Sequence, residues 1–402
     1  MASAFHIIAR PLVRSTLQGL HWGRQRLRRT VKGTRREVQR LQKDFGRLRR
    51  RAARSVSLAF EAVVRPVQKG TRRSYARVRE SALELPGRVQ ASLRELYFQY
   101  RLAPWGPAFF GTVANLRAPA DTLRRRRLAE RYRAQSKAIA MPADTGYARL
   151  SPGDLPGLDR VLAICRGIFE AKIGPVGGDV RADSEGKRGF LRNLLTNEDL
   201  QANPELIEFA LSEELLGAAS VYLGAIPNLN RVDLLYSVPR AGDGLAASQF
   251  FHLDPEGLTQ AKVFINIFDV HDPQGPFTFI PADHSRRLVQ EIGAQRRKAG
   301  VPIVGRYTDE EIAELGGADA AVEISGGPGS GVIVDTSRCL HCGSRVQPGA
   351  FRLCLYIQYC RSREIGNVFD PSRFARDPVR YLALVQSRAS AGAKVAAPHQ
   401  MA

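Results

Sequence analysis

Two histidines and one aspartate have the residue types and spacing of metal ligands. His252 and Asp254 lie in Gln249–Asp254, whose pattern predicts an extended strand. Residues i and i+2 of a strand point to the same face, so these two side chains can present a nitrogen and an oxygen to one ion. His341 follows a predicted buried strand, Gly331–Val334, and offers a third ligand. Two histidines and one carboxylate on one face of an ion are the donor set of non-haem Fe(II) oxygenases.

An arginine follows the second histidine within a predicted strand. Arg352 lies eleven residues after His341, in the apolar run Phe351–Ile357. A guanidinium held inside a sheet beside a metal is suited to bidentate binding of a carboxylate. The pattern therefore predicts a co-substrate that carries a carboxylate.

Each of these residues also has an ordinary explanation. A lone histidine in a strand is more often a hydrogen-bonded core residue than a ligand, and His-x-Asp is common by chance. Cys339 and Cys342 form a CxxC motif around His341, which suggests zinc, but no second cysteine or histidine pair at zinc spacing accompanies it. The full order of His-x-Asp, distal His and Arg in strand context is more specific than any of its parts.

This order resembles the phytanoyl-CoA dioxygenase family of Fe(II)- and 2-oxoglutarate-dependent oxygenases, over roughly residues 155–365. His252-Leu253-Asp254 is similar to the family's His-x-Asp motif. Asp269–Ser285 is similar to its acidic turn, Gly-Pro hairpin and Pro-Gly-Ser-His end. The sequence departs from the family at Phe251, where Trp is frequent, and at Pro281-Ala282-Asp283-His284. Neither departure is at a ligand position, so both concern the substrate rather than the chemistry.

The resemblance implies a cofactor, co-substrates and a reaction. Fe(II), 2-oxoglutarate and O2 are expected, with succinate and CO2 released as a small organic or lipid-like substrate is hydroxylated. The implied iron ligands are His252, Asp254 and His341, and the implied 2-oxoglutarate-binding residues are Arg352, Ser344, Lys262 and Asn266. Halogenating relatives carry Gly or Ala in place of the aspartate, so its presence favours hydroxylation.

The predicted elements favour a mainly β fold with flanking helices, a double-stranded β-helix of the jelly-roll, cupin-like type. Predicted strands cover 231–238, 249–254, 261–268, 277–280, 322–324, 332–335 and 351–359, and predicted helices 158–170, 204–223, 285–299 and 308–315. We expect the dioxygenase domain at 151–370. A basic, largely helical N-terminal arm at 1–150 precedes it, with the Pro- and Gly-rich stretch 142–157 as a linker. A C-terminal helix and disordered tail follow at 371–402.

Charge separates the arm from the rest of the chain. Residues 1–150 hold 34 Lys+Arg and 9 Asp+Glu, a net of +25, whereas the remainder holds 26 and 30, a net of −4; together these give +21. The arm contains an apolar stripe at helical spacing from Val38 to Val67. It suits packing on its own domain or on a partner helix, or binding to an anionic membrane surface. Nucleic acid is disfavoured, because aromatic residues do not interleave with the basic ones.

Five cysteines, four of them within 339–360, do not form a disulfide framework. We therefore expect a reduced, intracellular and cytoplasmic protein whose arm lies peripherally on a membrane. An organelle transit peptide is the alternative, since the first 36 residues contain no acid.

Two other functions fit the sequence. One is an inactive jelly-roll scaffold whose basic arm binds an anionic membrane or another partner; the intact His-Asp-His set and Arg352 argue against it. The other is a cupin-like enzyme with a different metal and no oxo-acid, which would not need Arg352. The primary substrate and the oligomeric state are not indicated by any motif.

Overall fold

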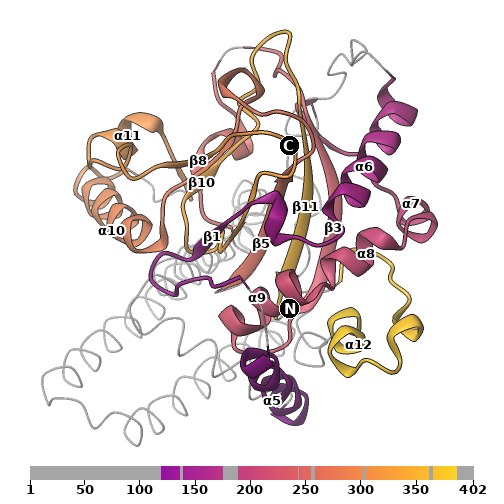
Figure 1. Ribbon diagram of the computed structural model, residues 1–402. Helices are drawn as coiled ribbons and strands as arrows, with labels where there is room; N and C mark the ends of the chain where they lie inside the picture. Colours follow the sequence, from indigo (N-terminus) through magenta and orange to yellow (C-terminus); the bar gives the residue numbers. More distant parts are fainter. Residues whose placement is uncertain are drawn as a thin grey trace, which may run out of the picture. The chain divides into compact units, whose positions relative to one another are not determined.

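The computed structural model describes residues 119–135, 139–174, 189–242, 244–254, 259–301, 305–361 and 365–386 (Figure 1). Its helices are α5 (Pro119–Gln135), α6 (Leu158–Ile173), α7 (Asn197–Ala202), α8 (Glu205–Ala210), α9 (Glu213–Leu223), α10 (Ala282–Lys298), α11 (Asp309–Ala313) and α12 (Pro378–Leu384). Its strands are β1 (Tyr147–Leu150), β2 (Leu191–Asn193), β3 (Asn228–Ser237), β4 (Phe251–His252), β5 (Gln260–Asn266), β6 (Phe277–Phe279), β7 (Arg306–Tyr307), β8 (Val322–Ile324), β9 (Gly331–Val334), β10 (His341–Cys342) and β11 (Arg352–Cys360).

Two sheets carry the fold. The larger has the strand order β1-β9-β5-β11-β3-β2 and the smaller β7-β4-β10-β6-β8. The pairings between these strands are all antiparallel among the described residues. The sheets share a core: Phe264 of β5 stacks on Phe277 of β6 with ring centroids 4.1 Å apart. The prediction of a mainly β fold with flanking helices is confirmed.

Alternation along β11 decides which side chains reach the space between the sheets. Leu355 and Ile357 belong to the apolar cluster under the helices, whereas Cys354 and Tyr356 belong to the cluster shared with the smaller sheet. Successive side chains of a strand point to opposite faces, so Arg352 lies on the same inner face as Cys354 and Tyr356. Both faces are covered, which explains why all nine residues of β11 are buried.

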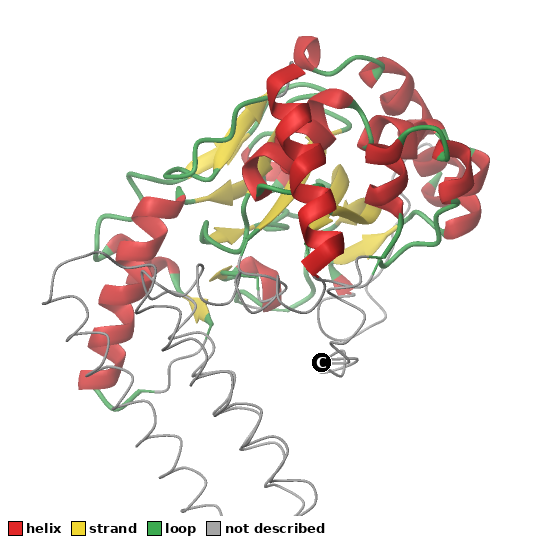
Figure 2. Cartoon of the chain, turned by 90° about the horizontal axis from the view of Figure 1, so that it is seen from below, coloured by secondary structure: helices red, strands yellow, loops and turns green. Residues whose placement is uncertain are grey.

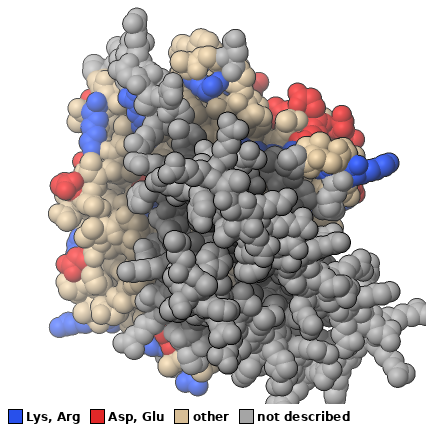
Figure 3. Space-filling model, turned by 180° about the vertical axis from the view of Figure 1, so that it is seen from behind, with Lys and Arg blue, Asp and Glu red and all other residues tan. Residues whose placement is uncertain are grey.

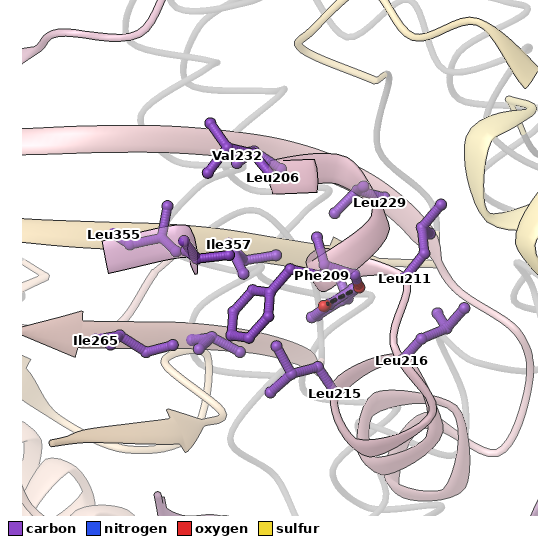
Figure 4. Packing of buried hydrophobic residues seen from close by; sticks show 14 of the residues in the cluster. Leu206, Phe209, Leu211, Leu215, Leu216, Leu229, Val232, Ile265, Leu355 and Ile357 are labelled. Carbon is purple, nitrogen blue, oxygen red and sulfur yellow. Dashed lines mark hydrogen bonds between the residues drawn. The ribbon is translucent and has the colours of Figure 1, made fainter. Parts of the chain in front are cut away.

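Helices cover the outer face of the larger sheet (Figure 2). Phe209 of α8 and Leu215 of α9 pack with Ile265, Leu355 and Ile357 of the sheet (Figure 4). The single helix predicted over 204–223 is two helices in the structure. The side chain of Ser212 accepts a hydrogen bond from the backbone N–H of Leu215 at 3.3 Å and so caps the start of α9.

The prediction of a linker at 142–157 is wrong for four residues, which form a strand. Tyr147–Leu150 form β1, which pairs with Gly331–Val334 at the edge of the larger sheet. The flanking prolines and glycines are typical of a linker, but Gly146 makes a turn at φ +74° that feeds the strand.

Most of the predicted arm, residues 1–118, lies outside the described residues, as does the tail at 387–402. Two elements inside the range 1–150 pack on the sheet and its helices, namely β1 and α5. On α5, buried Arg125 donates hydrogen bonds to Ile226 O at 3.2 Å and to Val385 O at 2.9 Å. α12 lies in the range expected for the C-terminal helix.

Figure 3 shows one face of the molecule. Where described residues are visible there, Lys and Arg side chains lie apart on mostly uncharged surface, and acidic side chains gather at one edge. None of the helices in the described ranges is long and apolar enough to cross a membrane.

Candidate metal centre

The two predicted histidine ligands lie directly opposite each other on neighbouring strands. His252 of β4 and His341 of β10 are partners in the antiparallel ladder, with ring centroids 4.2 Å apart. Asp254 lies two residues after His252 and its carboxylate reaches the same point. One ligand atom from each of the three side chains lies within 4.8 Å of the others. Among the described residues this is the one group of three or more such side chains with metal-binding geometry.

Backbone carbonyls fix the orientation of both imidazole rings. Nδ1 of His252 lies 2.9 Å from Phe250 O, and Nδ1 of His341 lies 3.1 Å from Cys339 O. A carbonyl can only accept, so each Nδ1 carries the proton and each Nε2 keeps its lone pair. The two Nε2 atoms lie 3.8 Å and 3.4 Å from oxygens of Asp254. Both rings therefore direct the ligating nitrogen to the same place.

The charge states of the group are those that a metal requires. Burial lowers the pKa of His341 to about 3, helped by His252, so its imidazole is neutral at pH 7. Burial alone would raise the pKa of Asp254, but the charge of Lys262 and the histidines outweigh it and hold that pKa well below the ordinary value. Neutral imidazoles and an ionised carboxylate are the forms that bind metal. The donor set fits a first-row divalent ion such as Fe(II).

The loop that leads into His341 is held by buried hydrogen bonds. Leu340 N donates to Ser285 Oγ at 2.8 Å, and Ser285 Oγ donates to Ile280 O at 2.7 Å. Asp254 N donates to Thr336 O at 2.9 Å, which ties the aspartate to the same loop. These hydrogen bonds fix the backbone on either side of the site, at the residue before His341 and at Asp254 itself. The two ligands are therefore held in place by more than their own side chains.

The cysteines around His341 do not join the group. The Cys339 thiol lies 3.5 Å from Thr145 O, and burial raises its pKa well above the ordinary value. Burial likewise raises the pKa of Cys342 to about 12. Neither cysteine belongs to a group of three or more metal-ligating side chains among the described residues. The arrangement of the described residues gives no support to a zinc site at the CxxC motif.

Arg352 is buried among neutral partners. Its Nη1 donates to Gly275 O at 2.7 Å and its Nη2 lies 3.5 Å from Ser344 Oγ, while Nε has no hydrogen-bond partner. No carboxylate within the described ranges forms an ion pair with it, and burial lowers its pKa. A buried cation without a counter-charge is costly, so this guanidinium is suited to an anionic ligand.

Ser344 lies beside this guanidinium in a strained conformation. Its φ is +60°, in the left-handed region that non-glycine residues rarely adopt. Its Oγ is 3.0 Å from Ser237 Oγ, and its carbonyl accepts from Gln249 Nε2 at 2.9 Å. These contacts keep the hydroxyl at Arg352.

The two residues predicted on the neighbouring strand have different surroundings. Lys262 donates from Nζ to Asp254 Oδ2 at 2.5 Å, so it touches a predicted metal ligand. Asn266 donates from Nδ2 to Ile324 O at 3.2 Å. Their role in binding 2-oxoglutarate stays a prediction.

Two residues near Arg352 were not predicted as site residues, Gly275 and Ser237. Gly275 has φ +64°, and a Cβ there would lie 2.6 Å from the carbonyl carbon of Arg345. The Gly-Pro pair at 275–276 is a sequence signal for this turn. Ser237 has no comparable signal, because it ends an ordinary strand.

We expect Gly275→Ala to destabilise the protein by more than its backbone conformation alone would cost. Left-handed backbone costs a non-glycine residue about 1–3 kcal/mol, and the clash with Arg345 adds to it. Gly349→Ala is the matched control, since Gly349 has φ +83° but open space around its Cβ position. Urea unfolding of both variants measures the difference. Equal losses of unfolding free energy would show that the close approach to Arg345 does not matter.

No family model matches this chain, and no curated protein matches it in sequence. Solved structures do match. The apo form of EctD from S. alaskensis is 16% identical with a TM-score of 0.36, over 57% of this chain and 79% of EctD. The non-heme α-ketoglutarate-dependent carbocyclase SnoK from nogalamycin biosynthesis is 16% identical with a TM-score of 0.35, over 61% and 92%.

A third similar structure is the epimerase SnoN in complex with Fe3+, α-ketoglutarate and nogalamycin RO. It is 17% identical with a TM-score of 0.35, over 59% of this chain and 83% of SnoN. At this level of likeness, function has to be inferred from the side chains of the present site.

Proposed function

We propose that the protein is a non-haem Fe(II)- and 2-oxoglutarate-dependent dioxygenase on a double-stranded β-helix, of the phytanoyl-CoA dioxygenase type. We propose further that it hydroxylates a small organic or lipid-like substrate. The observation that carries the proposal is the pairing of two features between the sheets. One is the His252, Asp254 and His341 group in metal-binding form, and the other is the buried Arg352 whose described partners are all neutral.

The residues have separate tasks in this proposal. His252 and His341 would hold Fe(II) through Nε2, and Asp254 would hold it through its carboxylate. The bound ion would supply the activation of O2 that, with 2-oxoglutarate as co-substrate, oxidises the substrate and releases succinate and CO2. Arg352 and Ser344 bind the far carboxylate of 2-oxoglutarate. Phe277 is buried and its ring centroid lies 5.7 Å from that of His341, so it contributes apolar surface beside this ligand.

The test is anaerobic addition of Fe(II) and 2-oxoglutarate to the purified protein, followed by visible absorption. A charge-transfer band that needs both additions supports the proposal without knowledge of the primary substrate. No band from folded, metal-loaded protein would reject it and favour the inactive scaffold. A band with Fe(II) and no 2-oxoglutarate dependence would favour a cupin-like enzyme of another type.

We also propose that the basic arm places the enzyme at an anionic membrane surface inside the cell. Residues 1–118 hold 26 Lys+Arg and 6 Asp+Glu, a net of +20. Basic, apolar-striped segments bind such surfaces through charge and apolar contact together.

We expect a chain that starts at Pro119 to lose binding to anionic vesicles while keeping its fold and the charge-transfer band. The truncation has to spare α5, because Arg125 binds the backbone of Ile226 and Val385. Co-sedimentation with anionic and with zwitterionic vesicles, at low and high salt, measures the binding. Unchanged sedimentation of the truncated chain would contradict the membrane role of the arm.

A further inference from the structure

A buried lysine contacts one oxygen of the predicted aspartate ligand. Nζ of Lys262 lies 2.5 Å from Oδ2 of Asp254, and only 8% of the Lys262 side chain is exposed. Lysine is seldom buried unless it is paired. If Lys262 only bound 2-oxoglutarate, that would not explain why its ammonium group contacts the carboxylate of Asp254, a predicted metal ligand.

The fold brings the lysine to this place from the larger sheet. Lys262 is on β5, two residues before Phe264, so both side chains point to the space between the sheets. Its Nζ also lies 5.4 Å from the ring centroid of Tyr356. The contact is a buried ion pair between the ammonium of Lys262 and the carboxylate of Asp254.

The two carboxylate oxygens of Asp254 have different surroundings. Oδ2 accepts the hydrogen bond from Lys262 and lies 3.4 Å from Nε2 of His341. Oδ1 lies 3.8 Å from Nε2 of His252. A strong, charge-assisted hydrogen bond to Oδ2 competes with a metal ion for that oxygen.

We propose that Lys262 is a positioning residue that holds Oδ2 of Asp254, so that the aspartate gives a metal ion one oxygen, Oδ1, instead of two. This inference rests on the proposed function. If both oxygens of Asp254 bound the ion, fewer of its positions would be open to a 2-oxo acid and O2 than if only one oxygen bound it.

The experiment compares Lys262→Met with Lys262→Gln in the full chain. Methionine removes the donor and keeps the volume, whereas the glutamine amide is neutral but can still donate to Oδ2. Co(II) is the probe, added without oxygen and followed by its visible absorption, and 2-oxoglutarate is then titrated into the Co(II)-loaded protein. We expect Lys262→Met still to be loaded with Co(II) at saturating metal, although loss of a contact that supports a ligand weakens metal binding about 10–100-fold. We expect the loaded variant to bind 2-oxoglutarate about tenfold or more weakly than the parent, a free-energy difference of about 1.4 kcal/mol. Lys262→Gln should bind it nearly as the parent does.

The outcomes separate this inference from the proposed function. Parent-like 2-oxoglutarate affinity in Lys262→Met, or equal losses in both variants, would overturn the positioning role. Absence of Co(II) and Fe(II) binding by the parent protein would instead overturn the proposed function, and the inference with it.

A structure of the parent protein with Co(II) is the second measurement, should Lys262→Met not fold. One Asp254 oxygen at about 2.0–2.2 Å from the ion, the usual carboxylate distance for such metals, supports the inference. Two coordinating oxygens would overturn it.

Discussion

We expect His341→Ala to lose the Fe(II)- and 2-oxoglutarate-dependent absorption band together with all measurable turnover. His341 lies in the middle of the site, with Nε2 3.4 Å from Asp254 and its ring facing His252. Loss of a contact that merely supports a ligand weakens metal binding about 10–100-fold, so loss of the ligand itself should exceed roughly 100-fold. Anaerobic Fe(II) titration measures the affinity directly.

His284→Ala is the matched control for that substitution. His284 lies on α10, its side chain is 47% exposed, and it does not belong to the group that could hold a metal. Its removal should leave both the band and the Fe(II) affinity unchanged. Parent-level Fe(II) affinity in His341→Ala would reject the assignment of the site.

Asp254 is a less direct test, because its removal changes more than metal binding. Asp254→Ala leaves the Lys262 ammonium buried without the carboxylate that it contacts. Breaking a buried pair in this way costs about 3–5 kcal/mol, so a loss of activity would be mixed with a loss of stability. His341→Ala leaves no such charge behind, since the imidazole is neutral at pH 7.

Strand periodicity explains why so much of the site could be predicted from the sequence. The i and i+2 rule predicts that His252 and Asp254 lie together, and they do, although β4 ends at His252 and Asp254 follows it. An arginine inside a buried strand indicates an anionic partner. The same rule puts Lys262 on the inner face of β5. It does not say which of the nearby charges the lysine contacts, because that depends on how β4 and β5 lie across the space between the two sheets.

Other features of the fold were hidden by local composition. β1 is a four-residue strand between glycine- and proline-rich segments, and its existence depends on pairing with β9, far away in the sequence. The break between α8 and α9 comes from one cap at Ser212 inside a continuous apolar pattern. In the first case a long-range strand pairing decides the structure, and in the second a single hydrogen bond does. Neither changes the spacing of apolar residues along the sequence, so the pattern cannot reveal them.

Arg352→Met should separate binding of the co-substrate from stability of the fold. We expect the apparent affinity for 2-oxoglutarate to fall about 10–100-fold, since a hydrogen bond to a charged group contributes about 1.5–3 kcal/mol. The affinity of Arg352→Lys for 2-oxoglutarate should lie between those of the parent protein and Arg352→Met. An ammonium keeps the charge but cannot form the two parallel hydrogen bonds of a guanidinium. Titration of 2-oxoglutarate into the anaerobic Fe(II) protein measures all three proteins on the same band.

The stability of Arg352→Met provides the control. The parent guanidinium is buried with only neutral hydrogen-bond partners among the described residues, Gly275 O and Ser344 Oγ. Its removal relieves the burial of a charge and gives up one short hydrogen bond, and these effects oppose each other. We therefore expect the free energy of unfolding without 2-oxoglutarate to change by less than about 1 kcal/mol. An unchanged 2-oxoglutarate affinity in a well-folded variant would contradict the role of Arg352, because the buried charge would then have no anionic ligand to explain it.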